Sequence, residues 1–244
     1  MESCEIFANL ATIPPIFVRL DGRAFHRLTQ KFGFLKPYDN RFCKAMVEVS
    51  KDLVAQSGLS PVFAFTFSDE ISLFFNDLPF SGRVEKIDSV AASFAASALT
   101  LALSSAEPLS FDARIVQTNT ESAVEYMINR QHEAWRNHLN AYCQHALIEE
   151  GMDANSAAAY LKGKPAQDLH ELMHKRGVNL AKTPAWQRRG ILIMKKEIEK
   201  DGFNPVTQEH VTVTRNKVAV NCDLPLLSTP EGQEFIRSLI SGKR

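Results

Sequence analysis

The stretch "VFAFTFSDEISLFF", residues 62–75, decides the fold. Two runs of aromatic and aliphatic residues flank three polar residues, Ser68, Asp69 and Glu70. Short apolar runs rich in Phe and interrupted by such polar residues are typical of buried β-strands on either side of a turn. The stretch therefore predicts two antiparallel strands joined by a tight turn, with two adjacent carboxylates at or beside that turn.

Apolar periodicity and turn residues on either side of this hairpin predict the remaining elements. Asp39 is a plausible N-cap for the helix within residues 38–58, and Gly58 is a plausible stop. We expect strands at 15–20, 109–117 and 190–198, helices at 83–104, 121–150, 154–161 and 165–174, and a strand or hairpin at 209–221. The order β-α-β-β-α-β predicts an α+β fold, a ferredoxin-like or split βαβ antiparallel sheet with helices packed on one face.

The amino-acid composition limits the classes of protein to which this chain can belong. The chain has 244 residues, of which 45% are hydrophobic, so it is long enough to bury a core. Its 28 basic and 28 acidic residues cancel, so any nucleic acid would bind a local patch. The four cysteines, Cys4, Cys43, Cys143 and Cys222, form no CxxC pair, which favours reduced thiols in the cytoplasm over a zinc site. We expect no membrane partner, because the most apolar helical stretch, 90–103, is short and interrupted by Ser and Thr.

Two carboxylates are expected to meet at one edge of the sheet. Asp21 follows the strand at 15–20, and Asp69 lies at the tip of the neighbouring hairpin. Side by side they would repel each other, and Mg²⁺, which prefers oxygen ligands, would relieve that repulsion. Gly22, which lacks a side chain, would let the backbone come close to the metal ion and offer it a carbonyl oxygen. The alternative is that "DG" and "SDE" are ordinary turns, since Asp and Gly are common in turns.

Three segments together carry a family resemblance. "DGRAFHRLTQKFGFLKPYDNR" (21–41), "FSDEISLFF" (67–75) and "FDARIV" (111–116), in this order, resemble the tRNA(His) guanylyltransferase family. "PAWQRRGILI" (184–193) is similar to the archaeal branch of tRNA(His) guanylyltransferase-like proteins. The resemblance implies a polymerase-palm-like core that uses two Mg²⁺ ions to extend the 5′ end of tRNA in the 3′–5′ direction. A nucleotide, typically ATP, first activates the 5′-phosphate, and the 3′-hydroxyl of an incoming NTP, such as GTP, then attacks it.

The same resemblance implies roles for individual residues. Asp21, the Gly22 carbonyl and Asp69 match the metal ligands, and Glu70 matches a carboxylate beside them, so the expected catalytic residues are Asp21, Asp69 and Glu70. The expected nucleotide and triphosphate site comprises Gly22, Arg23, Ala24, Phe25, His26, Lys36, Ser68, Arg83 and Lys86. Without the resemblance, His26 would be interpreted as an ordinary buried or capping histidine, and Arg83 and Lys86 as solvated residues in the first turn of a helix.

One departure from the family pattern bears on the substrate. Family members that add G to tRNA(His) carry a His-Ile-Asn-Asn stretch, where this chain has Trp135, Arg136, Asn137 and His138. This favours template-dependent addition that repairs 5′-truncated tRNAs, in which Watson–Crick pairing selects the nucleotide. The alternative is strict addition of the extra 5′ G to tRNA(His). Arg136 and His138 either face solvent or touch RNA, and Trp135 either packs in the core or contacts RNA.

A basic run provides a candidate path for RNA. Residues 175–196 contain seven Lys or Arg and no Asp or Glu, which is typical of a phosphate-binding track. The expected RNA-binding residues are Arg136, Asn137, Asn179, Arg188 and Arg189. The alternative is a solvated basic loop followed by a strand. Trp186 within it either stacks on a base or packs against the core.

The resemblance also sets expectations for domains and partners. Residues 1–120 would form the first part of the palm-like catalytic core. Residues 121–200 would complete the catalytic and tRNA-binding domain, and 201–244 would form a C-terminal extension. The partners would be tRNA, NTPs and further copies of the chain in a dimer or tetramer. Two other classes remain open: a non-catalytic tRNA-binding protein on the same fold, and a palm-fold cyclase that forms a cyclic nucleotide.

Overall fold

A computed structural model describes the backbone of residues 5–204 and 209–242, and the side chains in these ranges except those of His26 and residues 200–214. The strands are β1 (Ile16–Gly22), β2 (Phe63–Phe67), β3 (Glu70–Phe75), β4 (Phe111–Gln117), β5 (Ile191–Asn204) and β6 (Glu209–Asn221). The helices are α1 (Phe25–Lys31), α2 (Asn40–Ala55), α3 (Val84–Ala102), α4 (Thr120–Glu149), α5 (Ala154–Leu161), α6 (Ala166–His174), α7 (Ala185–Arg189) and α8 (Pro230–Ile240), with short 3-10 turns η2 (Pro79–Gly82) and η3 (Leu180–Lys182).

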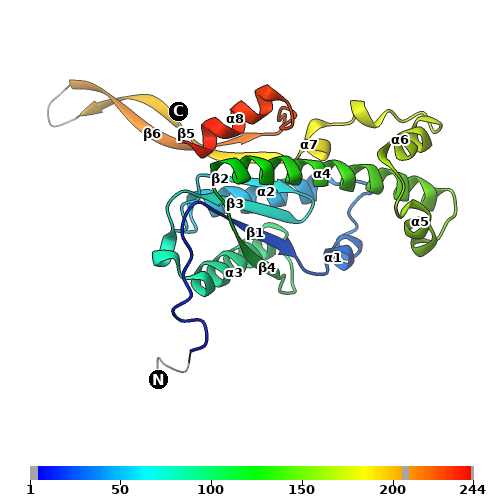
Figure 1. Cartoon of the computed structure of the whole chain (residues 1–244), viewed down its shortest axis with the longest axis horizontal. Coiled ribbons are helices and arrows are strands. Elements are labelled where there is room, and N and C mark those ends of the chain that lie inside the picture. Colours follow the sequence, from blue (N-terminus) through cyan, green and yellow to red (C-terminus); the bar gives the residue numbers. More distant parts are fainter. Residues whose placement is uncertain (1–4, 205–208, 243–244) are drawn as a thin grey trace.

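The strands form a six-stranded sheet in the order β4-β1-β3-β2-β5-β6, and every neighbouring pair is antiparallel. Helix α2 connects β1 to β2, and α3 connects β3 to β4, so the first four strands have the split βαβ arrangement. The predicted hairpin is confirmed, since β2 and β3 pair from Phe63↔Phe74 to Phe67↔Glu70. Its turn consists of Ser68 and Asp69. Figure 1 shows β2 and β3 side by side in the sheet.

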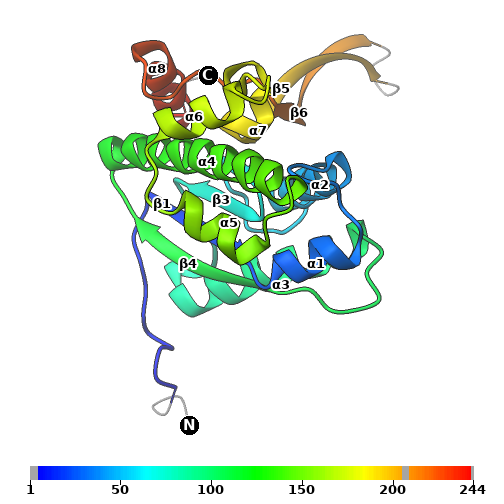
Figure 2. The same ribbon diagram turned by 90° about the vertical axis from the view of Figure 1, so that its right-hand side faces the viewer.

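Helices cover both faces of this sheet, whereas the sequence analysis placed them on one face. Alternate residues of β1, Ile16, Val18 and Leu20, pack in a core with α2 and α3. Phe17, which points the other way, belongs to a second core beneath α4 and α8. Figure 2 shows the sheet between α4 on one side and α3 on the other. The extra layer forms because α4 and the C-terminal helix α8 pack in one core with the aromatic face of β1, β2 and β3.

The long helix α4 serves two cores. It begins with a capping box in which the Asn119 side chain accepts a hydrogen bond from the backbone of Ser122, whose hydroxyl accepts one from the Asn119 backbone. Its first half packs on the sheet. Beyond Leu139 the helix extends past the sheet, and α5 and α6 pack against it through Leu161, Leu169 and Met173. Within the described ranges, every helix is too short or too polar to traverse a bilayer.

Two segments differ from their predicted form. The strand predicted at 190–198 continues to Asn204 as β5, and 209–221 is one strand, β6, paired with β5 along its length. The short helix α1 was not predicted, because its N-cap Ala24 has a φ of 58° and no side-chain cap, so the sequence carries no start signal there. Among the described cysteines, Cys43, Cys143 and Cys222 are free, in agreement with the expected thiols.

Candidate active site

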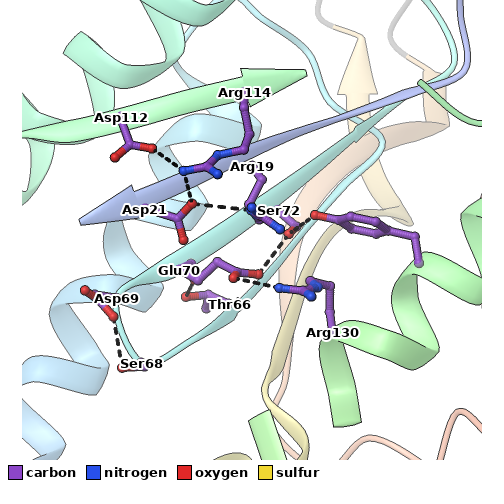
Figure 3. A network of polar contacts seen from close by, with 11 residues as sticks. Arg19, Asp21, Thr66, Ser68, Asp69, Glu70, Ser72, Asp112, Arg114 and Arg130 are labelled. Carbon is purple, nitrogen blue, oxygen red and sulfur yellow. Dashed lines mark hydrogen bonds and ion pairs between the residues drawn. The ribbon is translucent and has the colours of Figure 1, made fainter. Parts of the chain in front are cut away.

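Charged side chains gather on the α4 face of the sheet, at the ends of β1, β3 and β4 (Figure 3). In the strand register Asp21 lies opposite both Glu70 and Asp112, and Arg19 lies opposite Arg114. Directly paired residues point to the same face of an antiparallel sheet. The register therefore brings acidic and basic side chains from three strands into one cluster.

Asp21 is held by two arginines. Its Oδ2 atom lies 3.3 Å from Nε of Arg19 and 3.2 Å from an Nη of Arg114. The second arginine also donates to Oδ1 of Asp112 at 2.9 Å. The buried Oδ2 of Asp21 makes ion pairs but no aligned hydrogen bond with the described residues. Asp21 is thus an acceptor with unused capacity in a partly exposed position, at 34% side-chain exposure.

Asp69 lies in the β2–β3 turn beside the end of β1. Ser68, which has a φ of 50°, donates its hydroxyl to Oδ1 of Asp69 at 3.0 Å. The backbone N–H of Gly22 donates to the Asp69 carbonyl at 3.2 Å, which ties the end of β1 to the turn. Burial raises the pKa of Asp69, the Ser68 hydrogen bond opposes the rise, and the charge of Asp21 adds to it. The two carboxylates therefore interact electrostatically.

A side chain of α4 contacts Glu70 across the face of the sheet. Arg130 donates to its Oε2 at 3.1 Å, and the pair is largely buried. The Ser72 hydroxyl lies 3.4 Å from Oε1 and 2.9 Å from the Tyr126 hydroxyl. Burial raises the pKa of Glu70, which the Arg130 charge opposes. Arg130 is thus a part of the site that the sequence analysis missed.

The missed arginines differ in how visible they are in the sequence. Arg19 interrupts the apolar strand "IFVRL" two residues before Asp21, so strand alternation places both on one face. Arg114 follows from the same alternation only once the β1–β4 register is known. Arg130 lies 60 residues from Glu70, and no local pattern connects them.

Two neighbouring cavities open on these residues. The first, of about 350 Å³, is lined by Arg19, Asp21, Phe67, Ser68, Asp69, Glu70, Arg130, Glu133 and Asn137. The second, of about 210 Å³, shares Phe67, Ser68 and Asn137 with the first and is otherwise mostly aromatic and apolar. Its wall includes Lys36, whose ammonium donates to the Thr29 hydroxyl at 3.3 Å. A charged cavity and a mostly apolar one thus adjoin at Ser68.

The carboxylates fit a hard cation. Asp21 offers a buried oxygen without a hydrogen bond, and Asp69 has a raised pKa to which Asp21 contributes. A divalent cation would offset both effects, and Mg²⁺ is commonly held by one or two carboxylates with water completing its shell. No group of three His, Cys, Asp or Glu side chains poised for a metal occurs among the described residues. The protein would therefore supply two carboxylates, with the Gly22 carbonyl nearby.

The predicted nucleotide residues divide into two groups in space. Gly22, Lys36 and Ser68 lie at or beside the two cavities. Arg83 and Lys86 are exposed at the start of α3, and Arg83 forms a backbone bridge with Ala11, which precedes β1. Asp21 is at the opposite end of β1. The fold of one chain therefore does not bring Arg83 and Lys86 to the carboxylates.

The residues that follow Gly22 begin α1. Arg23 is exposed, Ala24 caps the helix through its left-handed backbone, and Phe25 is buried against Phe42 and Phe111. A Cβ atom at Gly22 would collide with the Phe25 ring, so glycine is required at that position. The side chain of His26 lies outside the described residues. Phe25 thus acts through packing that shapes the end of β1.

Asp39 has the capping role expected of it. Its carboxylate accepts from the backbone N–H of Arg41 at 2.6 Å and of Leu35 at 2.8 Å. Hydrogen bonds from the Arg41 guanidinium hold the pKa of Asp39 well below its usual range. Asp39 therefore starts α2 and fixes the loop that carries Lys36.

The α4 residues in the position of the family's His-Ile-Asn-Asn stretch face in different directions. His138 is fully buried, which corrects the expectation that it faces solvent or RNA. Its Nε2 lies 3.0 Å from the Thr183 hydroxyl, and burial lowers its pKa to about 4. Trp135 stacks on it at 5.4 Å between ring centroids, as core packing predicts. Asn137 and Arg136 are exposed, and Asn137 lines both cavities.

The basic run at 175–196 is not a continuous cationic surface. Arg176 pairs with Glu150 at 2.6 Å, and Lys175 pairs with Glu171 at 2.8 Å. Arg188 donates to the Thr183 carbonyl at 2.8 Å. Three other residues of this segment serve the fold: Arg189 donates to the Leu224 carbonyl at 2.7 Å, Asn179 caps η3, and Trp186 packs edge-on against Tyr38. Two acids outside the run, Glu150 and Glu171, therefore neutralise part of the predicted track.

Comparisons with known proteins agree with this architecture. A family model described as tRNAHis guanylyltransferase matches residues 1–119. A probable tRNA(His) guanylyltransferase of Dictyostelium discoideum is 28% identical over 219 residues, which cover 83% of this chain and 81% of that protein.

Two solved structures share the fold. A bacterial tRNA(His) guanylyltransferase-like protein in complex with ATP superposes with a TM-score of 0.73 at 26% identity, covering 93% of this chain and 92% of that one. The same kind of protein in complex with GTP superposes with a TM-score of 0.74 at 24% identity, covering 96% and 93%. By its sequence and its fold, the chain is similar to tRNA(His) guanylyltransferases, which are nucleotidyltransferases.

Proposed function

We propose that this protein adds nucleotides to the 5′ end of tRNA in the 3′–5′ direction and repairs 5′-truncated tRNAs under the control of the opposite strand. The observation that carries the proposal is the convergence of Asp21 and Asp69 at a charged cavity beside an apolar one. The split βαβ sheet that carries them is the arrangement expected of a polymerase-palm-like core. Such a site suits a phosphate in the first cavity and a nucleotide base in the second.

Asp21 and Asp69, with the Gly22 carbonyl, are the residues that would hold Mg²⁺. Two such ions would orient an attacking hydroxyl and offset charge on the phosphate undergoing transfer. The protein's own contribution is to keep the two carboxylates adjacent through the hydrogen bond from Gly22 to the Asp69 carbonyl. Glu70 is a positioning residue, because its Arg130 and Ser72 contacts fix the strand beside Asp21.

ATP, GTP and the other NTPs are the proposed substrates. Solved proteins of this fold bind ATP and GTP. Lys36 is a compact cation at the wall shared by the apolar cavity and the loop before α2, where a triphosphate could reach it. Ser68 lies between the two cavities, so it can contact a nucleotide that spans both.

The replaced His-Ile-Asn-Asn stretch favours templated addition. Of the four residues there, His138 is buried and Trp135 packs on it, so neither presents an edge that selects G. Base pairing with the opposite strand would then choose the nucleotide, and the protein would recognise RNA by shape and phosphate contacts. The second candidate, strict addition of G to tRNA(His), is favoured by the name and extent of the matched relative.

One experiment separates the two candidates. Purified protein, Mg²⁺, ATP and the four NTPs are incubated with two 5′-labelled RNAs: a tRNA other than tRNA(His) that lacks its first nucleotide, and full-length tRNA(His). We expect the truncated tRNA to gain the nucleotide that is complementary to the unpaired base on the opposite strand. When that base is mutated, the identity of the added nucleotide should change to match it. Growth of tRNA(His) alone, by G whatever lies opposite, would establish the second candidate. If neither RNA gained a nucleotide, a non-catalytic tRNA-binding protein would be the remaining candidate. A cyclic product formed from NTPs alone would indicate a cyclase.

A further inference from the structure

The apolar cavity beside the charged one offers a nucleotide base mostly aromatic and aliphatic walls. The hydroxyls of Thr66 and Ser68, which also line it, already donate to groups of the β2–β3 hairpin. Two side-chain amides, of Asn137 and Gln187, complete its lining. Asn137 faces the charged cavity as well, whereas Gln187 lines the apolar cavity and not the charged one. Gln187 is therefore the amide best placed to contact a base.

Gln187 is held in place from two sides. Its helix, α7, lies against α4 (Figure 1). The hydroxyl of Tyr142, on α4, donates to Oε1 of Gln187 at 2.8 Å. Burial raises the pKa of Tyr142, so this hydroxyl keeps its proton at neutral pH. The neighbouring Trp186 packs edge-on against Tyr38, with 5.6 Å between ring centroids, and anchors α7 at the cavity wall. The orientation of the amide is thus set before a ligand binds.

An amide whose carbonyl oxygen is occupied has only donors left to offer. Tyr142 engages Oε1 of Gln187, and Nε2 makes no hydrogen bond with the described residues, so two N–H donors remain. Along one edge guanine presents two neighbouring acceptors, N7 and O6, whereas adenine presents the acceptor N7 beside a donor amino group. A glutamine pairs with adenine by using its oxygen and its nitrogen together. Gln187 is therefore matched to guanine and mismatched to adenine.

We propose that Gln187 is a specificity-determining residue of the nucleotide site, which favours guanine over adenine by donating to N7 and O6, and that Tyr142 is the positioning residue that fixes its amide. The inference rests on the proposed NTP substrates and names the base preferred in the apolar cavity. Solved proteins of this fold are in complex with ATP and with GTP, so the fold alone accommodates either purine. The preference concerns the nucleotide that the protein binds by itself; a nucleotide paired with RNA is still selected by its partner base.

The first arm of the test changes the nucleotide and keeps the protein constant. Binding of GTP, ITP, 7-deaza-GTP and ATP to the full wild-type chain is measured by equilibrium titration with Mg²⁺ and without RNA. ITP keeps both N7 and O6, 7-deaza-GTP lacks N7, and ATP carries an amino group in place of O6. We expect GTP and ITP to bind alike and about tenfold more tightly than ATP, with 7-deaza-GTP between them.

The second arm changes the amide. Gln187→Leu removes the donors at similar size, so the four nucleotides should bind within about twofold of one another. Gln187→Glu leaves only acceptors, so the preference should reverse toward ATP, whose amino group donates. The matched control is Gln144→Leu, on a glutamine of α4 that lines a different cavity, and it should keep the wild-type preference.

A third variant, Tyr142→Phe, tests the positioning role. Without the hydroxyl the amide is free to turn its oxygen toward the base, so the preference for GTP should shrink while overall nucleotide affinity changes little. Each conclusion uses the ratio of two affinities in one protein, so a variant that is only partly folded does not imitate the effect. An undiminished preference in Tyr142→Phe would overturn the positioning role.

Three results would each overturn the role of Gln187: equal binding of GTP and ATP by the wild type, equal binding of GTP and 7-deaza-GTP by the wild type, or an undiminished preference in Gln187→Leu. Nucleotide addition to tRNA by the wild type is scored separately. Addition without a preference that depends on Gln187 refutes only this inference. A preference that depends on Gln187, without addition, refutes only the proposed catalysis.

Discussion

The α4 face of β1 changes character within two residues. Phe17 stacks on Tyr126 with 4.1 Å between ring centroids and lies 4.9 Å from the Phe74 ring. Arg19, the next residue on this face, is instead part of the charged cluster around Asp21. The aromatic end of this face, around Phe17, and its charged end, around Asp21, lie on the same strands beneath the same helix. The difference teaches that the aromatic end fixes the strand register, and that this register determines where the charges meet.

The two ends also differ in how α4 covers them. Over the aromatic end the helix contributes Val124 and Met127, which are buried. Over the charged end it contributes Arg130, Glu133 and Asn137, which line an open cavity. Mutations at the aromatic end should therefore alter stability, whereas mutations at the charged end should alter chemistry. Three predictions test that division.

The largest effect is expected at the charged end. Asp69→Ala removes one of two proposed metal-binding carboxylates, so nucleotide addition should fall by about a thousandfold or more, since metal stabilisation of the transition state is worth several kcal/mol. tRNA binding should largely persist. The matched control is Asp77→Ala, an exposed aspartate just beyond the other end of β3. Rates are measured with a pre-activated, 5′-triphosphorylated RNA, and turnover near the wild-type rate in the Asp69 variant would rule out the two-metal assignment.

A large effect of another kind is expected at the aromatic end. Phe74→Ala leaves a cavity between Phe17 and Phe63 and should lower the free energy of unfolding by about 3–5 kcal/mol. Denaturant unfolding measures this loss. Nucleotide addition per folded molecule at low temperature should stay within a few-fold of wild type. A loss of activity without a loss of stability would contradict the division between the two ends.

The smallest effect concerns pH and magnesium. The folded-state pKa values of Asp69 and Glu70 are raised, mainly by burial, so these groups favour the folded state when protonated. Their contribution to stability is present below their ordinary pKa values and is lost as pH rises through the raised ones. Thermal unfolding should therefore show a decline with rising pH that is shallower in Asp69→Ala.

Magnesium should oppose that decline, since a cation stabilises the ionised carboxylates. Mg²⁺ at ten times its dissociation constant contributes about 1.4 kcal/mol to the folded state. The wild type should gain this at neutral pH and lose it at acid pH, and Asp69→Ala should gain little at either. Equal stabilisation of both proteins by Mg²⁺ would locate the ion elsewhere.

Local signals were sufficient for much of the fold. The alternation and turn residues of 62–75 predicted the β2–β3 hairpin, and Asp39 predicted the start of α2. Both depend on interactions within a few residues, which a sequence displays directly. Helix α1 could not be predicted in the same way, because it begins with a left-handed alanine and no capping side chain. The predicted roles of Arg136, Asn137 and Asn179 in RNA binding stay predictions.

By itself the sequence determined most of the elements, the order that yields a split βαβ sheet, and the placement of Asp21 and Asp69 near the ends of neighbouring strands. Only the tertiary structure decided which distant residues meet. It brought Arg130 to Glu70, kept Arg83 and Lys86 away from the carboxylates, neutralised Arg176 with Glu150, and set Lys196 opposite Lys217. The physical reason is range: capping and alternation act between near neighbours in the chain, whereas ion pairs and strand register act through space.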